Sequence, residues 1–165
     1  MLFRSTLASS LSIEDMVLTD AILTGNHGIG IFTLDTGRMY GDTLALIDAI
    51  RARYGHSIEV YRPQPGPVAQ YVTVHGRDAF YASVDLRKRC CDIRKVEPLK
   101  RALAGKKAWI TGLRREQSAT RAELPVQSWD EGNGLEKFNP LADWSEDEAW
   151  AYIRAFDVPY NALYE

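Results

Sequence analysis

The chain has 165 residues, 45% of them hydrophobic and 25% charged, with a formal net charge of −2. This length and composition suit one globular domain with a core of its own. The sequence has no apolar run of the roughly 20 residues that a membrane-spanning helix needs, and its start lacks the basic-then-apolar layout of a signal peptide, so we expect neither a membrane location nor secretion.

The first half of the chain alternates predicted strands and helices. A strand is expected over residues 3–8, and the capping box at 12–15 opens a helix that runs to about Leu23. After a glycine turn, a buried-type strand is expected over 29–34 and an amphipathic helix over 43–54. Gly55 closes this helix, and a third strand follows over 58–61.

The second half continues the same alternation. The proline-rich segment 63–67 breaks the chain before a helix over 68–75, and a basic helical stretch covers 84–103. Pro98 interrupts that stretch and predicts either a kink or two helices with Pro98 near the N-terminus of the second. A strand over 107–111 ends at Gly112, and a last helix follows the capping box at 145–148. The pattern predicts a single α/β domain over residues 1–165 with a mostly parallel sheet.

Charge is distributed unevenly along the chain. Residues 87–101 carry seven basic side chains against two acids, a local charge of +5, whereas residues 130–165 carry a local charge of −7. A basic segment within an acidic protein favours a localised anion site over general nucleic-acid binding. A solvated charged helix face explains the same run and stays open as an alternative.

Three predicted strand ends carry residues suited to anions. Ser9 and Ser10 follow the first strand, residues 34–38 follow the second, and residues 111–118 follow the fourth. Hydroxyls, backbone N–H groups and arginine forks at such ends suit phosphate or ribose. Each motif alone is also typical of ordinary turns. The Asp-Thr-Gly run at 35–37 does not indicate an aspartic protease, which needs a second carboxylate in an all-β setting.

Cys90 and Cys91 are the two cysteines of the chain. Cys90 falls at helical spacing with Ile93 and Val96, which is typical of a buried stripe. As metal ligands, adjacent cysteines need a distorted backbone, and nearby cations would stabilise their thiolates. Lys95 lies one turn after Cys91 on the same face. From the residues alone, buried thiols and metal ligands both remain open.

Together these motifs resemble the assimilatory sulfonucleotide reductases. The resemblance rests on residues 9–16, 32–38, 90–99, 111–118 with Thr120 and Arg121, and 137–144. It implies an adenine-nucleotide α-hydrolase-like fold of the PP-loop (HUP) type, with three layers and a mostly parallel sheet. Ser9 begins a degenerate pyrophosphate loop without the glycine pair.

The adjacent cysteines place the resemblance in the branch that reduces adenylyl sulfate (APS) to sulfite and AMP in sulfate assimilation. It implies thioredoxin or a glutaredoxin-like protein as reductant and a 4Fe-4S cluster, and it leaves a homo-oligomer open. Because two neighbouring cysteines rarely form a disulfide with each other, we expect a cytoplasmic location. The implied cluster ligands are Cys90 and Cys91, and Lys95 is the implied catalytic residue. The implied substrate-binding residues are Ser9, Ser10, Leu34, Asp35, Thr36, Gly37, Gly112, Arg114, Arg115 and Arg121.

The sequence also departs from the family pattern. The family has a downstream C-x-x-C and a nucleophilic cysteine near its C-terminus, and neither occurs here. We therefore expect a chain that is truncated at both ends. We also expect it to be inactive by itself, because a 4Fe-4S site needs four thiolates. Reduction of 3′-phosphoadenylyl sulfate (PAPS) is one alternative function. A nucleotide-binding module without redox activity is another.

Overall fold

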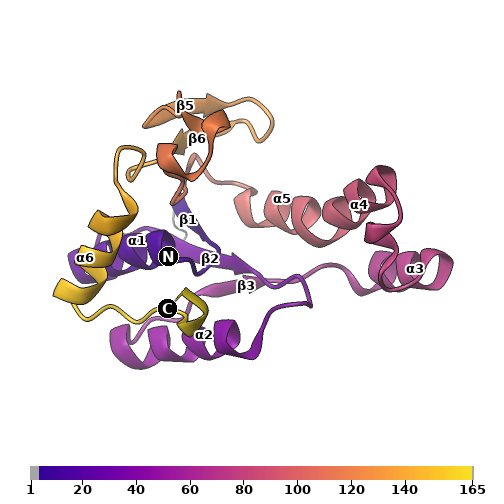
Figure 1. Cartoon of the computed structure of the whole chain (residues 1–165), viewed down its shortest axis with the longest axis horizontal. Helices are drawn as coiled ribbons and strands as arrows, with labels where there is room; N and C mark the ends of the chain where they lie inside the picture. Colours follow the sequence, from indigo (N-terminus) through magenta and orange to yellow (C-terminus); the bar gives the residue numbers. More distant parts are fainter. Residues whose placement is uncertain (1–3, 165) are drawn as a thin grey trace. The chain divides into compact units, whose positions relative to one another are not determined.

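The computed structural model describes residues 4–164, and its strands and helices alternate up to residue 75 (Figure 1). The strands are β1 (Ser5–Ser9), β2 (Gly30–Leu34), β3 (Glu59–Tyr61), β4 (Ala108–Ile110), β5 (Gln127–Asp130) and β6 (Leu135–Phe138). The helices are α1 (Ile13–Gly25), α2 (Gly41–Tyr54), α3 (Pro65–His75), α4 (Val84–Cys91), α5 (Glu97–Leu103) and α6 (Glu146–Ala155). None of the described helices is long and apolar enough to cross a bilayer. The predicted α/β class is confirmed.

Six strands form one sheet in the order β3-β2-β1-β4-β6-β5. β1 pairs in parallel with β2 and with β4, and β4 pairs in parallel with β6. β5 runs antiparallel to β6 at the edge. The sheet is therefore mostly parallel, as predicted. The chain leaves β1 for β2 on one side and later returns to β4 on its other side, which creates a topological switch point where open α/β sheets bind ligands.

Helix ends follow the side-chain signals in the sequence. Ser12 caps α1 by accepting a hydrogen bond from the Asp15 N–H at 3.3 Å. Ser145 and Glu148 form a reciprocal capping box at the start of α6. These oxygens satisfy N–H groups that the first helical turn leaves without intrahelical acceptors. Both helix starts were predicted from the same residues.

A buried carboxylate ties three helices together. Asp20 on α1 accepts hydrogen bonds from the Tyr54 hydroxyl of α2 at 2.7 Å and from the Tyr152 hydroxyl of α6 at 2.9 Å. Burial and this carboxylate raise the pKa of Tyr152 to about 12, so its hydroxyl stays protonated and keeps donating. α1 and α6 accordingly lie side by side (Figure 1).

The structure corrects three details of the predicted elements. Helix α3 begins at Pro65 rather than at residue 68, because proline lacks the N–H that the first helical turn leaves unused. The β5–β6 hairpin was not predicted, since its strands are polar and half exposed. Of the first predicted strand, residue 3 lies outside the described residues, and β1 extends one residue further, to Ser9.

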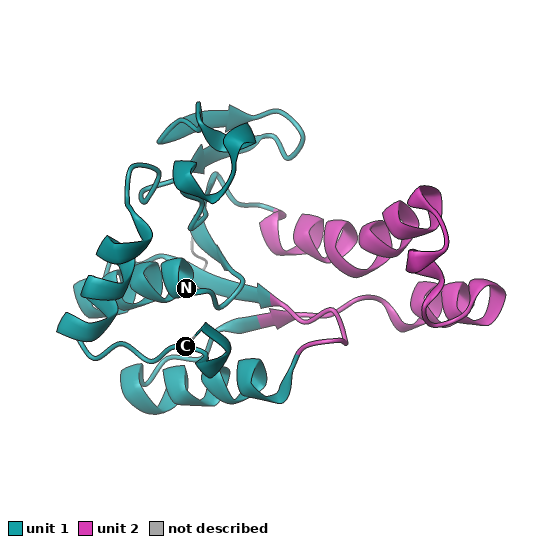
Figure 2. Ribbon diagram, in the orientation of Figure 1, with its two compact units in different colours: residues 1–33, 40–59, 105–165 teal, residues 34–39, 60–104 magenta. Residues whose placement is uncertain are grey.

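The chain divides into two compact units (Figure 2). The sheet unit comprises residues 1–33, 40–59 and 105–165, and the helical unit comprises residues 34–39 and 60–104. The helical unit has ten lysines and arginines against five acids, a net charge of +5, whereas the sheet unit has ten against seventeen, a net charge of −7. The charge asymmetry of the sequence thus separates along structural units.

Candidate functional site

The turn after β1 is folded around one carboxylate. Asp15 Oδ2 accepts hydrogen bonds from the Ser10 backbone N–H and hydroxyl, both at 2.7 Å. Ser9 Oγ accepts from the Leu11 N–H at 3.1 Å, and Leu11 has the left-handed φ of 63°. Burial raises the pKa of the Asp15 carboxyl, an effect that the Ser10 hydrogen bonds oppose. The predicted Ser9–Ser10 turn is therefore held in shape by its own side chains.

Gly112 lies beside this turn, just after β4. A Cβ atom at Gly112 would come within 2.3 Å of Asp15 Oδ1 and 3.0 Å of Glu14 Cβ. Any side chain here would therefore displace the start of α1. The structure brings Ser9, Ser10 and Gly112 together at the switch point between β1 and β4, and it adds Asp15, which sequence reasoning treated as a cap alone.

The arginines after Gly112 have different surroundings. Arg114 is 4% exposed, and its Nε donates to Glu14 Oε1 at 2.9 Å. Arg115 pairs with Asp143 and donates from Nε to the Leu124 carbonyl at 2.8 Å. Arg121 donates to Gln117, a neutral side chain, and is half buried. The structure thus places Arg114 within the protein interior and leaves Arg121 with its charge uncompensated by any described carboxylate.

In the helical unit, the turn that follows β2 is fixed by local hydrogen bonds. Asp35 Oδ1 accepts from the Gly37 N–H at 2.9 Å, and Gly37 has the positive φ of 77° that glycine adopts without strain. Arg62 pairs with the other Asp35 oxygen at 3.1 Å. Arg94 donates to the Thr36 carbonyl at 2.7 Å. Asp35 and Gly37 therefore shape this turn.

Both cysteines line one pocket of the helical unit. The pocket has a volume of about 550 Å³ and contains five basic residues. Its lining residues are Thr36, Arg38, Phe80, Arg87, Lys88, Cys90, Cys91, Arg94 and Lys95. Cys90 is half buried, Cys91 is exposed, and no residue of α4 is fully buried. The surroundings therefore favour accessible thiols near cations over buried thiols.

The backbone is distorted directly after the cysteines. Helix α4 ends at Cys91, and Asp92–Val96 form a π-helical segment before α5. The Glu97 N–H donates to the Asp92 carbonyl, five residues back. Pro98, which has no N–H to donate, follows in the first turn of α5. The predicted alternative of two helices with Pro98 near the start of the second is confirmed, and the wide turn between them is of a kind that often occurs at functional sites.

Phe80 is a pocket residue that the sequence did not single out, and it lies beside Arg38, the arginine at the end of the second predicted strand. The Arg38 guanidinium lies 4.6 Å from the Phe80 ring centroid and pairs with Asp78 at 3.5 Å. It also donates to the Arg77 carbonyl. No motif in the sequence predicts this contact, because Arg38 lies about 40 positions from Phe80 and Asp78 and meets them only in the folded unit.

The thiol pair fits an iron–sulfur centre in part. Two thiols in a cationic pocket are suited to thiolate ligation. Among residues 4–164, however, no three His, Cys, Asp or Glu side chains converge as a metal site. The described residues therefore supply two ligands of the four that a 4Fe-4S cluster needs.

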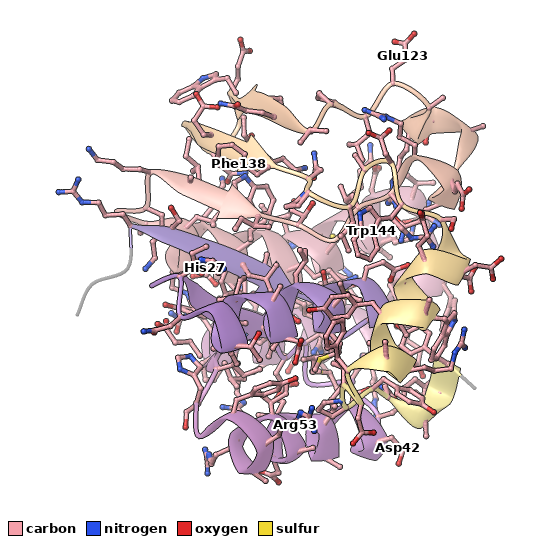
Figure 3. All side chains as sticks on the ribbon, turned by 90° about the vertical axis from the view of Figure 1, so that its left-hand side faces the viewer. His27, Asp42, Arg53, Glu123, Phe138 and Trp144 are labelled. Carbon is pink, nitrogen blue, oxygen red and sulfur yellow. The ribbon has the colours of Figure 1, made fainter. Side chains whose placement is uncertain are left out.

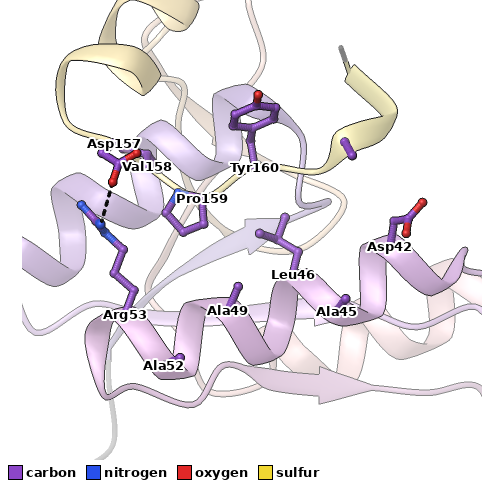
Figure 4. Close-up of a pocket in the computed structure, with 11 residues that line it drawn as sticks. Asp42, Ala45, Leu46, Ala49, Ala52, Arg53, Asp157, Val158, Pro159 and Tyr160 are labelled. Carbon is purple, nitrogen blue, oxygen red and sulfur yellow. Dashed lines mark ion pairs between the residues drawn. The ribbon is translucent and has the colours of Figure 1, made fainter.

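A second groove, of about 810 Å³, lies in the sheet unit between α2 and residues 157–162 (Figure 4). Its floor is made of small side chains that include Ala45, Ala49 and Ala52. Asp42 and Arg53 lie at opposite ends of α2 (Figure 3), and Arg53 pairs with Asp157 at 3.7 Å. None of the predicted site residues lines this groove.

The phosphoadenosine phosphosulfate reductase domain family matches residues 4–165 of this chain. The adenosine 5′-phosphosulfate reductase of Burkholderia cepacia is 59% identical over 95% of the chain and 63% of its own length. That of Neisseria meningitidis serogroup A is 56% identical over 95% of the chain and 65% of its own length. The chain thus spans less than two thirds of these curated relatives.

Solved structures show the same fold. The crystal structure of phosphoadenylyl-sulfate reductase from Candida auris, in a phosphate complex, is 27% identical with a TM-score of 0.82 and covers 99% of this chain and 78% of that one. The NH3-dependent NAD synthetase of Campylobacter jejuni covers 93% of this chain and 64% of that one, at 12% identity and a TM-score of 0.60. The second similarity concerns the fold alone.

Proposed function

Since the chain belongs to the phosphoadenosine phosphosulfate reductase domain family, we propose that its protein reduces APS to sulfite and AMP in sulfate assimilation. The observation that carries this proposal is the cationic pocket in which Cys90, Cys91 and Lys95 meet. Relatives at 56–59% identity bear the name adenosine 5′-phosphosulfate reductase. A reducing cytoplasm is the compartment that suits free thiols of this kind.

The proposed reaction transfers two electrons to the sulfate sulfur. The bond between that sulfur and the bridging oxygen breaks, AMP leaves with the oxygen, and sulfite is released. A dithiol protein such as thioredoxin or a glutaredoxin supplies the two electrons and becomes a disulfide, with release of two protons. Neither Cys90 nor Cys91 is assigned the attack on sulfur, because both are proposed as ligands.

In the sheet unit, Ser9, Ser10, Gly112 and Arg121 are the residues proposed to contact an adenylyl nucleotide. In the helical unit, taken by itself, residues 34–37 and Lys95 are proposed as a nucleotide- and anion-binding set. Fixed cations stabilise the charge that develops on the departing AMP.

Cys90 and Cys91 are proposed to hold two corners of a 4Fe-4S cluster. When bound, this group supplies fixed charge and redox-active iron beside the anion pocket. Lys95 stands one helical turn from Cys91 and lines the same pocket, so its ammonium serves both the thiolates and a bound anion. Arg94 is held by the Thr36 carbonyl and fixes the π-helical segment against the turn after β2.

The test is sulfite release from APS by the full-length protein to which this chain belongs, with thioredoxin and a thioredoxin-reducing system. We expect turnover of APS and little turnover of PAPS, and we expect AMP to compete for binding better than adenosine 3′,5′-bisphosphate. A preference for PAPS and the bisphosphate would indicate the PAPS reductase activity named for the Candida auris relative. Nucleotide binding without any sulfite release, together with an intact mass that matches this chain and no bound iron or sulfide, would leave a non-redox binding module.

A further inference from the structure

The segment after β4 contains three arginines, and their hydrogen-bond partners differ. We propose that Gln117 is a positioning residue that orients Arg121 toward the anionic end of the substrate, and that the buried pair Glu14–Arg114 anchors Gln117. This assignment rests on the proposed function, because the anion it serves is the phosphosulfate of an adenylyl nucleotide.

Arg114 is buried in the protein interior and paired with carboxylates. Its Nε and Nη2 atoms both lie 2.9 Å from Glu14 Oε1, and its Nη1 lies 3.3 Å from Glu116 Oε2. The Arg114 and Glu14 side chains are 5% and 7% exposed. A guanidinium that is buried and already neutralised by carboxylates has little charge left to offer a ligand. Arg114 is therefore an anchor of the segment.

Arg115 also has partners within the protein, one through a hydrogen bond and one through an ion pair. Its Nε donates to the Leu124 carbonyl at 2.8 Å, and its guanidinium pairs with the Asp143 carboxylate. These contacts join the start of the segment to two positions further along the chain. Arg115 therefore helps to fold the segment, and its charge is compensated like that of Arg114.

Gln117 connects the anchor to the remaining arginine. Its Nε2 donates to Glu14 Oε1 at 3.3 Å, and its Oε1 accepts from the Arg114 N–H at 3.1 Å and from Arg121 Nη1 at 2.5 Å. A carboxylate on one side and two donors on the other determine which end of the amide is oxygen. Gln117 is thus held in one orientation by Glu14 and Arg114, and it holds Arg121 in turn.

A neutral amide directs Arg121 without cancelling its charge. Among the residues that the structure describes, no carboxylate pairs with Arg121, so its remaining N–H donors and its positive charge are available. A preorganised guanidinium binds phosphate or sulfate oxygens through two parallel hydrogen bonds. A glutamate in place of Gln117 would orient the same group but would neutralise it, and the glutamine therefore suits an anion-binding arginine.

The test is calorimetric binding of APS and of adenosine to wild type, Arg121→Ala, Gln117→Ala and the double variant. Arg121→Ala should weaken APS binding about 30-fold and Gln117→Ala about fivefold. The double variant should bind APS within about twofold of Arg121→Ala, because Gln117 acts through Arg121. Adenosine binding and the melting temperature should not change. The matched control is Gln127→Ala, the same substitution at an exposed position of β5 in the same unit.

The outcomes separate this inference from the proposed function. If the effects of the two single substitutions on APS affinity add in full, Gln117 acts on its own and the positioning role is overturned. An equal loss of adenosine affinity in Gln117→Ala would overturn it too, since that indicates a general structural defect. If wild type binds APS and Arg121→Ala binds it equally well, Arg121 is not the anion contact. If wild type binds neither ligand, the proposed function itself fails, and the inference fails with it.

Discussion

The buried ion pair of the sheet unit and the cationic pocket of the helical unit use their charged groups in opposite ways. In the sheet unit, Glu14 and Arg114 are paired in the interior, and Asp15 is held by Ser10. In the helical unit, Lys88 and Lys95 line an open pocket, and no carboxylate pairs with them among the described residues. The paired, buried groups fix a shape, whereas the accessible cations keep their charge for a ligand. Substitutions in the first set should therefore reduce stability, and those in the second set should reduce function.

The largest expected effect is on folding of the sheet unit. Glu14→Ala leaves the Arg114 guanidinium buried without its main partner, which should lower the free energy of unfolding by about 3–5 kcal/mol. Urea denaturation measures this change. The control is Glu116→Ala, whose carboxylate also contacts Arg114 but is 61% exposed, and should cost less than about 1 kcal/mol. Equal losses for the two variants would contradict the distinction between buried and accessible charge.

The second largest expected effect is a loss of catalytic turnover, without a loss of stability, when Lys95 is replaced. In the full-length protein, Lys95→Ala removes a pocket cation and should lower kcat for APS about 100-fold, with little change in melting temperature, because Lys95 is exposed. Lys100→Ala, on α5 outside the pocket, is the matched control and should leave the rate unchanged. An unchanged rate in Lys95→Ala would remove this residue from the mechanism.

A smaller effect concerns the pH dependence of stability. Burial raises the pKa of Asp15 above its ordinary value of 3.8, so the folded protein holds this proton more tightly than the unfolded chain. Stability should therefore fall as the pH rises from about 4 through the folded pKa. In Asp15→Asn this contribution is missing, and the free energy of unfolding should fall less over the same range in a urea titration. The control is Asp48→Asn, at an exposed position of α2, where the pH dependence should match wild type.

The smallest expected effect on stability belongs to the thiols. Because Cys91 is exposed and α4 has no fully buried residue, Cys91→Ser should change the free energy of unfolding by less than about 0.5 kcal/mol. The same substitution should abolish iron and sulfide uptake in anaerobic reconstitution of the full-length protein, as chemical analysis would show. Full retention of iron and sulfide would refute the ligand role of Cys91.

Local signals in the sequence predicted most of the fold. Ser12 and Ser145 cap helices where expected, and the parallel sheet follows from alternating strands and helices. The β5–β6 hairpin was missed because its short, polar and half-exposed strands lack the apolar alternation that identifies a strand. For the cysteines, the sequence left buried thiols and metal ligands open. The structure shows accessible thiols in a pocket with Lys95, and their role as cluster ligands stays a prediction.

By itself, the sequence determined the α/β class, the turns at the strand ends and the basic setting of the cysteine pair. These features depend on neighbours within a turn or a strand, so they can be read along the chain. Tertiary structure alone decided which charged side chains are neutralised by a partner and which keep their charge for a ligand. Arg114 and Arg121 look equivalent in the sequence, but Glu14, one hundred positions away from Arg114, neutralises that arginine, while Gln117 leaves the charge of Arg121 intact. Burial and long-range pairing set the chemistry of a charged group, and both arise only when the chain folds.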